Sequence, residues 1–444
     1  MAIINQVVSG GGTTPTGTIQ ITTNGTHDVT NYATADVQVP TTAPDAYTEK
    51  IIYDYASAKN LGSFGVAIFD MSTVARLDQG CLAYAWADFH SGNPTIPAFN
   101  NIDIDLSSVS TFNVDCLIYA FRGRTGINSI KIGTATSSLN GTVYMLCWAG
   151  VDKVEIGCKF IFGSAQSMCE HCTATKISFP NLEEIRNSMQ YFARYTSQIV
   201  DFEMPELKTV TGANGFQYLI ADSNIRILNF PKLESITGQL CNNCFSNDSL
   251  LEEINVPSLH TLNGNDYLAG NGTFANAAIG CTSLTTMKFQ SLSTVGRNTM
   301  YNMFNGCTAL QSLWFYALNT TSFGSYTNQF NNMLTGCTGV TVHFPIAIQS
   351  TIGSWTSVTG GFGGTNTTVL FDLVTSLTGA DGNTYTRQEK DSTSTATAWV
   401  YNDTLYYTSG VSDNANGVNE PSVSDAIYSD AACQNSITTI TAIA

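Results

Sequence analysis

The sequence has little charge. Only 12% of its 444 residues are Asp, Glu, Lys or Arg, which is about half the usual share of a soluble domain. Basic residues are the scarcer kind, with 18 against 34 acidic residues and a formal net charge of −16. Binding to nucleic-acid phosphates requires clustered Lys and Arg. Because the chain has no such cluster, we expect no nucleic-acid partner.

Long apolar runs are also missing. No stretch of ~18 apolar residues occurs, so no membrane insertion is expected. The first residues, MAIINQVVSGGGTTPTG, lack the basic and apolar regions of a secretory signal peptide. Ser, Thr, Asn and Gly supply solubility in place of charge, as in many extracellular and virion β-proteins. A virion protein that is made in the host cytoplasm and released by lysis is consistent with both observations.

Signatures of catalysis and metal binding are missing as well. The five histidines are scattered, and no HExxH, GxSxG or P-loop motif occurs. The 12 cysteines are too sparse for a disulfide scaffold, and the CxxC pairs Cys169–Cys172 and Cys241–Cys244 lie too far apart for one zinc site. We interpret three acidic pairs as solvated charge: Asp103/Asp105, Asp201/Glu203 and Glu252/Glu253. The sequence therefore predicts no catalytic residue, no metal, no cofactor and reduced thiols, in a protein that is not an enzyme.

A degenerate repeat fills the middle of the chain. The template L-x-x-I-x-F-P-x-L-x-x-I recurs, for example as IRILNFPKLESI (225–236) and LEEINVPSLHTL (251–262). Its sixth residue, named the anchor here, falls at Met71, Leu106, Ile132, Ile156, Phe179, Met204, Phe230, Val256, Phe289, Phe315 and Phe344. Most steps between anchors lie in or near the roughly 20–29-residue window of leucine-rich repeats.

Each anchor belongs to a predicted strand. The residue two positions earlier is apolar too, such as Leu228 before Phe230, and the residue between them is expected to point outward. One repeat is too small to bury its apolar face, whereas stacked repeats bury a continuous core. We therefore predict at least nine stacked parallel strands, with buried anchors and with Phe230, Phe289 and Phe315 in one sheet.

A second element recurs between the strands, as in MFNGCTAL (303–310) and MLTGCTGV (333–340). Cys172, Cys281, Cys307 and Cys337 each lie seven or eight residues before the next anchor. Because free Cys behaves as a small hydrophobe, this constant phase predicts a stacked column of small buried side chains.

The combined pattern F-x-x-C-x-x-L-x-x-I-x-F-P resembles the BspA-type leucine-rich repeat family over about residues 65–355. The chain departs from that pattern where Pro does not follow the anchor, as at Gln290 and Tyr316. The resemblance implies a mainly β solenoid with a parallel sheet and short helical or irregular connectors. It also implies a surface protein that takes part in binding and adhesion.

The two ends of the chain depart from the repeat. Within 1–46, TIQITTNGTHDV predicts a β-hairpin around Asn24-Gly25, and residues 16–40 resemble an N-terminal segment of phage tail and fibre proteins. We expect this segment to attach the chain to other virion proteins or to oligomerise it. The solenoid is expected over 47–360. Residues 361–444 show alternating strands and turn signals, which predict an all-β module whose aromatic residues serve as a sheet core or as a glycan platform.

A binding site is predicted near the end of the solenoid. If the strands stack, the residues one before each anchor form an exposed ladder, which includes Lys288, Trp314 and His343. These three, with Tyr316 nearby, combine a cation, large rings and an imidazole without a matching acid. Trp and Tyr beside a basic residue are typical binding anchors. The alternative is that a C-terminal segment or a neighbouring subunit covers Trp314.

The sequence as a whole predicts a structural and recognition protein of a phage particle. It would be a fibre or receptor-binding protein that attaches to a host cell-surface glycan or protein. A homo-oligomer is expected, most simply a trimer, because a lone hairpin is marginally stable in water. Two alternatives remain: an exported BspA-like bacterial adhesin, and a tailspike-type polysaccharide depolymerase.

Overall fold

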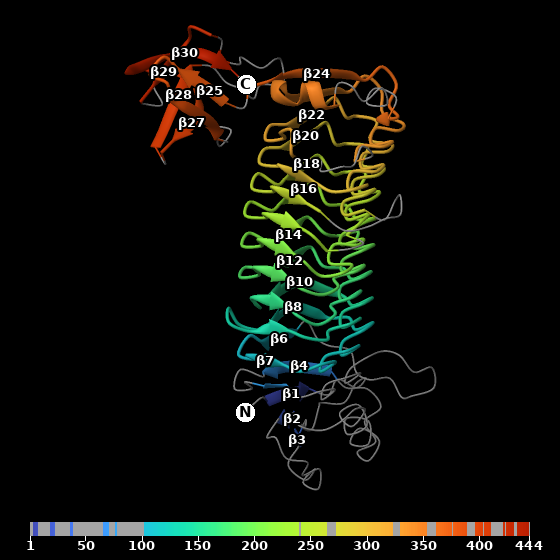
Figure 1. Ribbon diagram of the computed structural model, residues 1–444. Helices are drawn as coiled ribbons and strands as arrows, with labels where there is room; N and C mark the ends of the chain where they lie inside the picture. The colour runs from blue at the N-terminus through green and yellow to red at the C-terminus, as the bar shows by residue number, and fades with distance from the viewer. Residues whose placement is uncertain are drawn as a thin grey trace.

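The computed structural model describes part of the chain. It gives the strands at 3–7, 18–22, 36–38, 65–70 and 76–77 and all residues from 102 on except 239–240, 264–271, 323–328, 353–360, 375, 389–395, 403, 410–420, 422, 430–432 and 444. The described part is an elongated solenoid that carries a β-barrel at one end (Figure 1). Among its helices, none is long and apolar enough to cross a membrane.

The first wall of the solenoid is the sheet that the anchors predict. Its parallel strands are β4 (Gly65–Asp70), β6 (Ile102–Leu106), β8 (Ile127–Ile132), β10 (Val151–Ile156), β12 (Lys176–Ser178), β14 (Asp201–Glu203), β16 (Ile227–Asn229) and β18 (Glu253–Asn255). Every anchor from Leu106 to Phe344 is at most 1% exposed, and Met71 lies outside the described residues. The predicted mainly β solenoid of stacked parallel strands, an architecture of the leucine-rich-repeat type, is confirmed.

The prediction of one continuous sheet is wrong. Strands β20 (Thr286–Phe289), β22 (Ser312–Phe315), β23 (Thr341–Pro345) and β24 (Thr368–Leu373) form a separate four-stranded parallel sheet. Phe230 therefore belongs to the first sheet, where it follows β16, whereas Phe289 and Phe315 belong to the separate four-stranded sheet. The break falls in the repeat between Val256 and Phe289, whose step of 33 residues is longer than its neighbours.

A second wall continues across this break. It consists of two-residue parallel strands: β5 (Arg76–Leu77), β7 (Thr111–Phe112), β9 (Ser138–Leu139), β11 (Phe160–Ile161), β13 (Glu184–Ile185), β15 (Thr209–Val210), β17 (Ser235–Ile236), β19 (Thr261–Leu262) and β21 (Thr294–Val295). One apolar cluster runs between the walls from Leu77 to Phe362. The solenoid therefore keeps a single core although its main sheet is divided.

The third wall consists of stacked turns, named the turn wall here, such as those at 114–123, 143–148, 166–171 and 190–195. Alternate N–H groups of each turn donate to carbonyl groups of the next repeat, as Tyr144 does to Gln166 over 3.0 Å. Residues with positive φ recur at intervals of four in these turns, for example Tyr144 (φ 55°) and Trp148 (φ 61°).

The predicted cysteine column lies behind the turn wall. Its members are all buried, and three of them are polar residues rather than cysteines. In chain order they are Cys172, Thr196, Ser223, Asp248, Cys281, Cys307 and Cys337. The Cys307 thiol donates to the carbonyl oxygen of Ala278 over 3.0 Å, and the Thr196 hydroxyl donates to that of Cys169 over 3.1 Å. The column therefore accepts small side chains of several kinds, most of which form a hydrogen bond within it.

Reduced and metal-free thiols stay a prediction. Eleven of the cysteines lie among the described residues, where none is in a disulfide and no cluster of potential metal ligands occurs; Cys81 lies outside that part. Burial raises the pKa of Cys158 to about 12. A thiol with so high a pKa is a poor nucleophile at neutral pH.

Asp248 is the ionisable member of the cysteine column. Its Oδ1 accepts from the backbone N–H and the hydroxyl of Ser223, at 2.5 Å and 2.8 Å. Its Oδ2 is buried and has no hydrogen-bond partner among the described residues. Burial raises the pKa of this carboxyl well above its usual range, although the hydrogen bonds from Ser223 oppose the shift.

Asp248→Asn is therefore expected to stabilise the protein at neutral pH. A raised folded-state pKa gives stability that is present below the unfolded-state pKa of about 3.9 and is lost as pH rises through the folded-state pKa. The amide keeps an acceptor for Ser223 and removes this loss. Urea unfolding at pH 7 and pH 4 should show a gain at pH 7 that narrows at pH 4. A variant that is less stable at pH 7 would mean that Asp248 is held as an anion.

The two ends of the solenoid are closed by β-structure. At one end β1 (Ile3–Val7) pairs antiparallel with β4 and with β2 (Thr18–Thr22), which is parallel to β3 (Asp36–Gln38). The hairpin predicted around Asn24-Gly25 is wrong, because its first strand β2 pairs with β1 and β3 on its two sides; residues 24–25 themselves lie outside the described residues. At the other end β24 pairs with β23, so solenoid pairing extends past residue 360. The 3-10 turn η2 (Ile346–Ile348) and helix α2 (Gln349–Ile352) precede it.

The C-terminal all-β module is a closed barrel. Its strands are β25 (Ser376–Gly379), β26 (Thr384–Gln388), β27 (Ala396–Tyr401), β28 (Thr404–Ser409), β29 (Ala426–Tyr428) and β30 (Ser436–Ile443). Tyr385 and Trp399 are buried in its core, where the Trp399 Nε1–H donates to the Thr408 hydroxyl over 2.9 Å. Tyr385 and Trp399 therefore belong to the core of the module, whereas Tyr401, Tyr406, Tyr407 and Tyr428 are half-buried, so the glycan-platform alternative stays a prediction for these four.

Candidate functional site

The predicted ladder of residues that precede the anchors is present, but its last rings, Trp314 and His343, are buried and form no exposed site. Lys288, Trp314 and His343 are direct neighbours on β20, β22 and β23. Lys288 is half-buried, but Trp314 is only 4% exposed, Tyr316 3% and His343 8%. The expectation that these rings face solvent is wrong.

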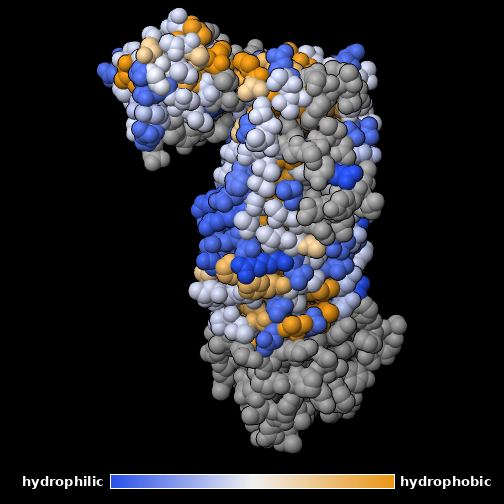
Figure 2. All heavy atoms as spheres, viewed as in Figure 1, coloured by the Kyte–Doolittle hydropathy of each residue, from blue (hydrophilic) through white to orange (hydrophobic). Residues whose placement is uncertain are grey.

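The C-terminal part of the chain covers them, as the alternative in the sequence analysis had it. Trp314 and Tyr316 form a buried cluster with Leu373 of β24. The Arg387 guanidinium, on barrel strand β26, lies 4.9 Å from the centre of the Tyr316 ring. Arg387 also donates to the Val374 carbonyl over 2.9 Å. In the view of Figure 2, apolar residues gather over the barrel and its junction with the solenoid.

His343 is paired with a carboxylate that the sequence did not predict. Its Nδ1 lies 2.8 Å from Oδ2 of Asp372 on the neighbouring strand β24. The ring stacks on Trp314 with centroids 3.6 Å apart and an interplanar angle of 2°. We name this group (Trp314, Tyr316, His343, Asp372 and Arg387) the joint, because it attaches the barrel to the solenoid.

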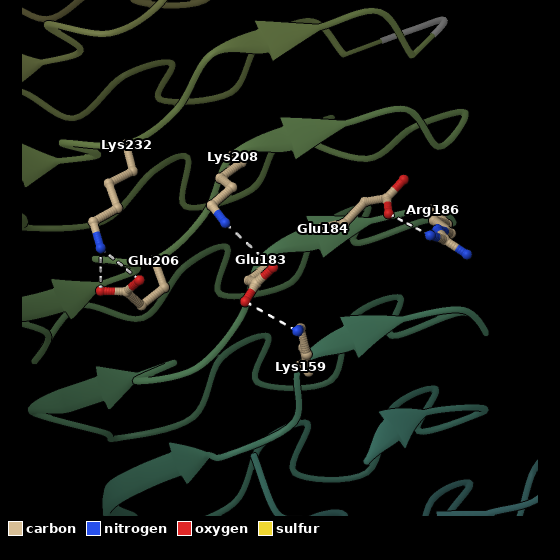
Figure 3. A network of polar contacts seen from close by, with 7 residues as sticks. All are labelled: Lys159, Glu183, Glu184, Arg186, Glu206, Lys208 and Lys232. Carbon is tan, nitrogen blue, oxygen red and sulfur yellow. Dashed lines mark hydrogen bonds and ion pairs between the residues drawn. The ribbon is translucent and has the colours of Figure 1, made fainter. Parts of the chain in front are cut away.

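Many charged side chains of the solenoid pair with one another. Figure 3 shows Glu183 between Lys159, at 3.2 Å, and Lys208, at 3.4 Å, with the pairs Lys232–Glu206 and Arg186–Glu184 beside it. A hydrogen bond from Lys159 holds the pKa of the Glu183 carboxyl below its usual range, and Lys208 adds to the shift. Surface pairs of this kind contribute about 0–1 kcal/mol each, so this network indicates alignment of repeats rather than a site.

The acidic pairs of the main sheet are paired in the same way. Lys176 on β12 reaches Glu203 over 2.8 Å and Asp201 over 3.8 Å on β14. The Arg226 guanidinium donates to both carboxylate oxygens of Glu252, with a shortest distance of 2.7 Å. Two of the three acidic pairs therefore lie against basic partners at the surface.

The turn wall carries an aromatic surface that the sequence analysis did not predict. We name it the aromatic ridge, and it consists of Tyr119, Arg122, Tyr144, Trp148, His171, Tyr191, Arg194, Tyr195 and Tyr218. Trp148 stacks on His171 with centroids 3.7 Å apart and an interplanar angle of 10°. His171 stacks in turn on Tyr195, at 4.6 Å.

Two arginines brace the tyrosines of the ridge. The Arg122 guanidinium lies 5.5 Å from the ring centre of Tyr119 and 5.7 Å from that of Tyr144. Arg194 lies 4.3 Å from the ring centre of Tyr195, and its Nε donates to Asp222 over 2.9 Å. Burial lowers the pKa of His171 below its usual range, with a smaller contribution from Arg194 and an opposing one from Glu170. The His171 imidazole lies between the indole of Trp148 and the phenol of Tyr195.

The ridge is exposed where the predicted site is not. Trp148 is 56% exposed and Tyr195 38%. An exposed row of large rings with arginines is the composition that binding hot spots favour. The signal was present in the sequence, since Tyr119, Tyr144, Tyr191 and Tyr218 each lie twelve or thirteen residues before an anchor. It was missed because the repeats were aligned on their buried residues.

Comparisons with known proteins add little. No protein-family model matches the chain, and no curated protein matches it either. A leucine-rich repeat protein from Bacteroides ovatus is similar in structure at 16% identity and a TM-score of 0.23, over 70% of this chain and 96% of that one. A leucine rich cell surface protein from Faecalibacterium prausnitzii shows 9% identity and a TM-score of 0.14, over 69% and 90%. TM-scores this low carry no argument. The assignment of this chain as a mainly β solenoid of stacked parallel strands therefore rests on its strand pairing.

Proposed function

We propose that this chain is a non-enzymatic structural and recognition protein of a phage particle. It acts as a fibre or receptor-binding protein, and its solenoid displays the aromatic ridge for attachment to a host surface. The observation that carries the recognition role is the exposed ridge. The assignment to a phage particle has separate support, namely the resemblance of residues 16–40 to the N-terminal segment of phage tail and fibre proteins.

The strained backbone of the ridge indicates that its large rings serve a function. Tyr119, Tyr144, Trp148, Tyr191, Tyr195 and Tyr218 all have positive φ, which costs a bulky residue on the order of 1–3 kcal/mol. Later repeats fill the same turn positions with the residues that tolerate this conformation: Asn243, Asn247, Asn276, Gly280, Asn302, Gly306, Asn332 and Gly336. Large rings therefore occupy strained positions, two of them exposed (Trp148 and Tyr195), where an Asn or Gly would fit at lower energy.

The remaining parts of the chain take supporting roles in this proposal. The N-terminal segment attaches the chain to other virion proteins, and its strands extend the main sheet. The barrel, held by the joint, forms one end of the display. The working form is a homo-oligomer, with a trimer as the simplest arrangement for a fibre. The protein is made in the host cytoplasm and released within the particle.

Two alternatives place the same solenoid elsewhere. A BspA-like bacterial surface protein would use the ridge for adhesion, and the resemblance of the repeats favours that reading. A tailspike depolymerase would need a pair of carboxylates beside the ridge. Of the acids nearest to it, Asp222 is held by Arg194, at 2.9 Å, and by the Asn247 amide, also at 2.9 Å.

Fractionation of a lysed culture of the source organism tests the proposal. We expect mass spectrometry to find the chain in purified particles, and the purified chain to block adsorption of those particles to cells. Recovery from washed cell envelopes instead would support the BspA-like adhesin. Release of reducing sugar from host polysaccharide would support the depolymerase. Light scattering that finds a monomer would contradict the oligomer.

A further inference from the structure

The stacked rings of the ridge end on an open face. In the positions of the turn wall that Trp148, His171 and Tyr195 occupy in successive repeats, the preceding repeat has Gly123. The same hydrogen-bond ladder connects them, since the Gly123 N–H donates to the carbonyl of Cys147, next to Trp148, over 2.9 Å. His171 covers one face of the indole, and the residue on its other side has no side chain.

The exposure of Trp148 agrees with this asymmetry. The side chain is 56% exposed, although its ring is in parallel contact with His171 at 3.7 Å. His171 fixes the plane of the indole from below, so little conformational entropy remains to be lost when a ligand packs on the open face. The site is thus a flat apolar platform that is already in place.

A charged side chain and a backbone hydrogen bond lie beside this platform. Arg122 precedes Gly123 in the chain and is held over Tyr119 and Tyr144. Glu170 precedes His171 and accepts the Trp148 N–H through its backbone carbonyl, over 2.9 Å. A ligand on the open face of the indole therefore has the Arg122 guanidinium as a neighbouring hydrogen-bond donor beside an apolar centre.

We propose that the open face of Trp148 above Gly123 binds a pyranose ring of a glycan. A pyranose has an apolar face of C–H groups and an edge of hydroxyls that donate and accept hydrogen bonds, and this platform matches both features. A nucleic acid is a poor match, since the chain carries a formal net charge of −16 and phosphates require clustered cations. This inference rests on the proposed recognition function and names its ligand class.

Two substitutions to Asn test the platform without disturbing the turn. Asn has positive φ at the equivalent position 247, so Gly123→Asn keeps the backbone and places a side chain over the indole. Trp148→Asn removes the platform and relieves its strain. The matched control is Gly306→Asn, at the equivalent turn position of a later repeat outside the ridge, where φ is also positive (76°) and an added Cβ meets no atom closer than 3.8 Å.

Binding is measured by calorimetric titration of the full chain with soluble oligomers of glucose, galactose, mannose and N-acetylglucosamine. We expect at least one oligomer to bind the wild type, with affinity reduced roughly tenfold or more in Gly123→Asn and Trp148→Asn and retained in Gly306→Asn. A wild type that binds none of them, or two platform variants that bind as well as the wild type, would overturn the proposal.

The same variants separate this proposal from the wider one. If Gly123→Asn and Trp148→Asn bind every oligosaccharide with the affinity of the wild type, but the wild type still blocks adsorption, only the glycan site is wrong. If the oligosaccharide titrations behave as expected and the wild type does not block adsorption, the glycan site stands and the attachment function is wrong.

Discussion

Trp314→Ala is expected to lower the free energy of unfolding by about 3–5 kcal/mol, the usual cost of removing a buried large ring. The ring is 4% exposed and lies between His343 and Tyr316. Its loss also removes the ring against which His343, Tyr316 and Leu373 pack at the joint. Urea unfolding followed by circular dichroism measures the change.

Trp148→Ala is the matched control for this prediction. It removes the same side chain from a 56% exposed position of the same solenoid, and surface substitutions usually stay within about 0.5 kcal/mol. Limited proteolysis should also cut Trp314→Ala between the solenoid and the barrel faster than the control. Equal effects of the two substitutions would mean that the joint contributes nothing to stability.

Phe315→Ala should have an effect of similar size, through the core rather than the joint. Its ring stacks between Phe289, at 4.9 Å, and Phe344, at 5.1 Å, and Phe330 meets its edge at 5.6 Å. Removing it leaves a cavity that spans three repeats, at a cost of about 3–5 kcal/mol. Because a solenoid is stabilised by contacts between neighbouring repeats, unfolding should begin in this segment.

Hydrogen exchange tests where that unfolding begins. Faster exchange in Phe315→Ala should be confined to β20–β24, with β8–β14 unchanged. Phe162→Ala serves as the control, because its ring is 40% exposed and lies against Arg186 at 4.7 Å. A loss spread evenly over the chain would contradict the local character of the effect.

The sequence was sufficient for the features that repeat. Because each strand adds to its neighbour in register, the phase of the anchors alone determined which residues are buried, from Leu106 to Phe344. The outward ladder followed from the two-residue period of a strand, and Asp105↔Lys131 and Trp314↔His343 pair as expected. The cysteine column followed from its constant phase in the same way.

Tertiary structure decided what lies outside the period. The burial of Trp314 depends on Leu373 and Arg387, which belong to segments that follow the repeats and share no phase with them. The break after β18 falls in a step of 33 residues, whereas β4 and β6 stay paired across a step of 35, so step length alone does not reveal it. The aromatic ridge depends on backbone conformation, since only positive φ at Tyr144 and Trp148 reveals that rings stand where Asn would fit. Local periodicity thus determined the solenoid of this protein, whereas long-range packing and backbone strain determined which of its surfaces are free to bind.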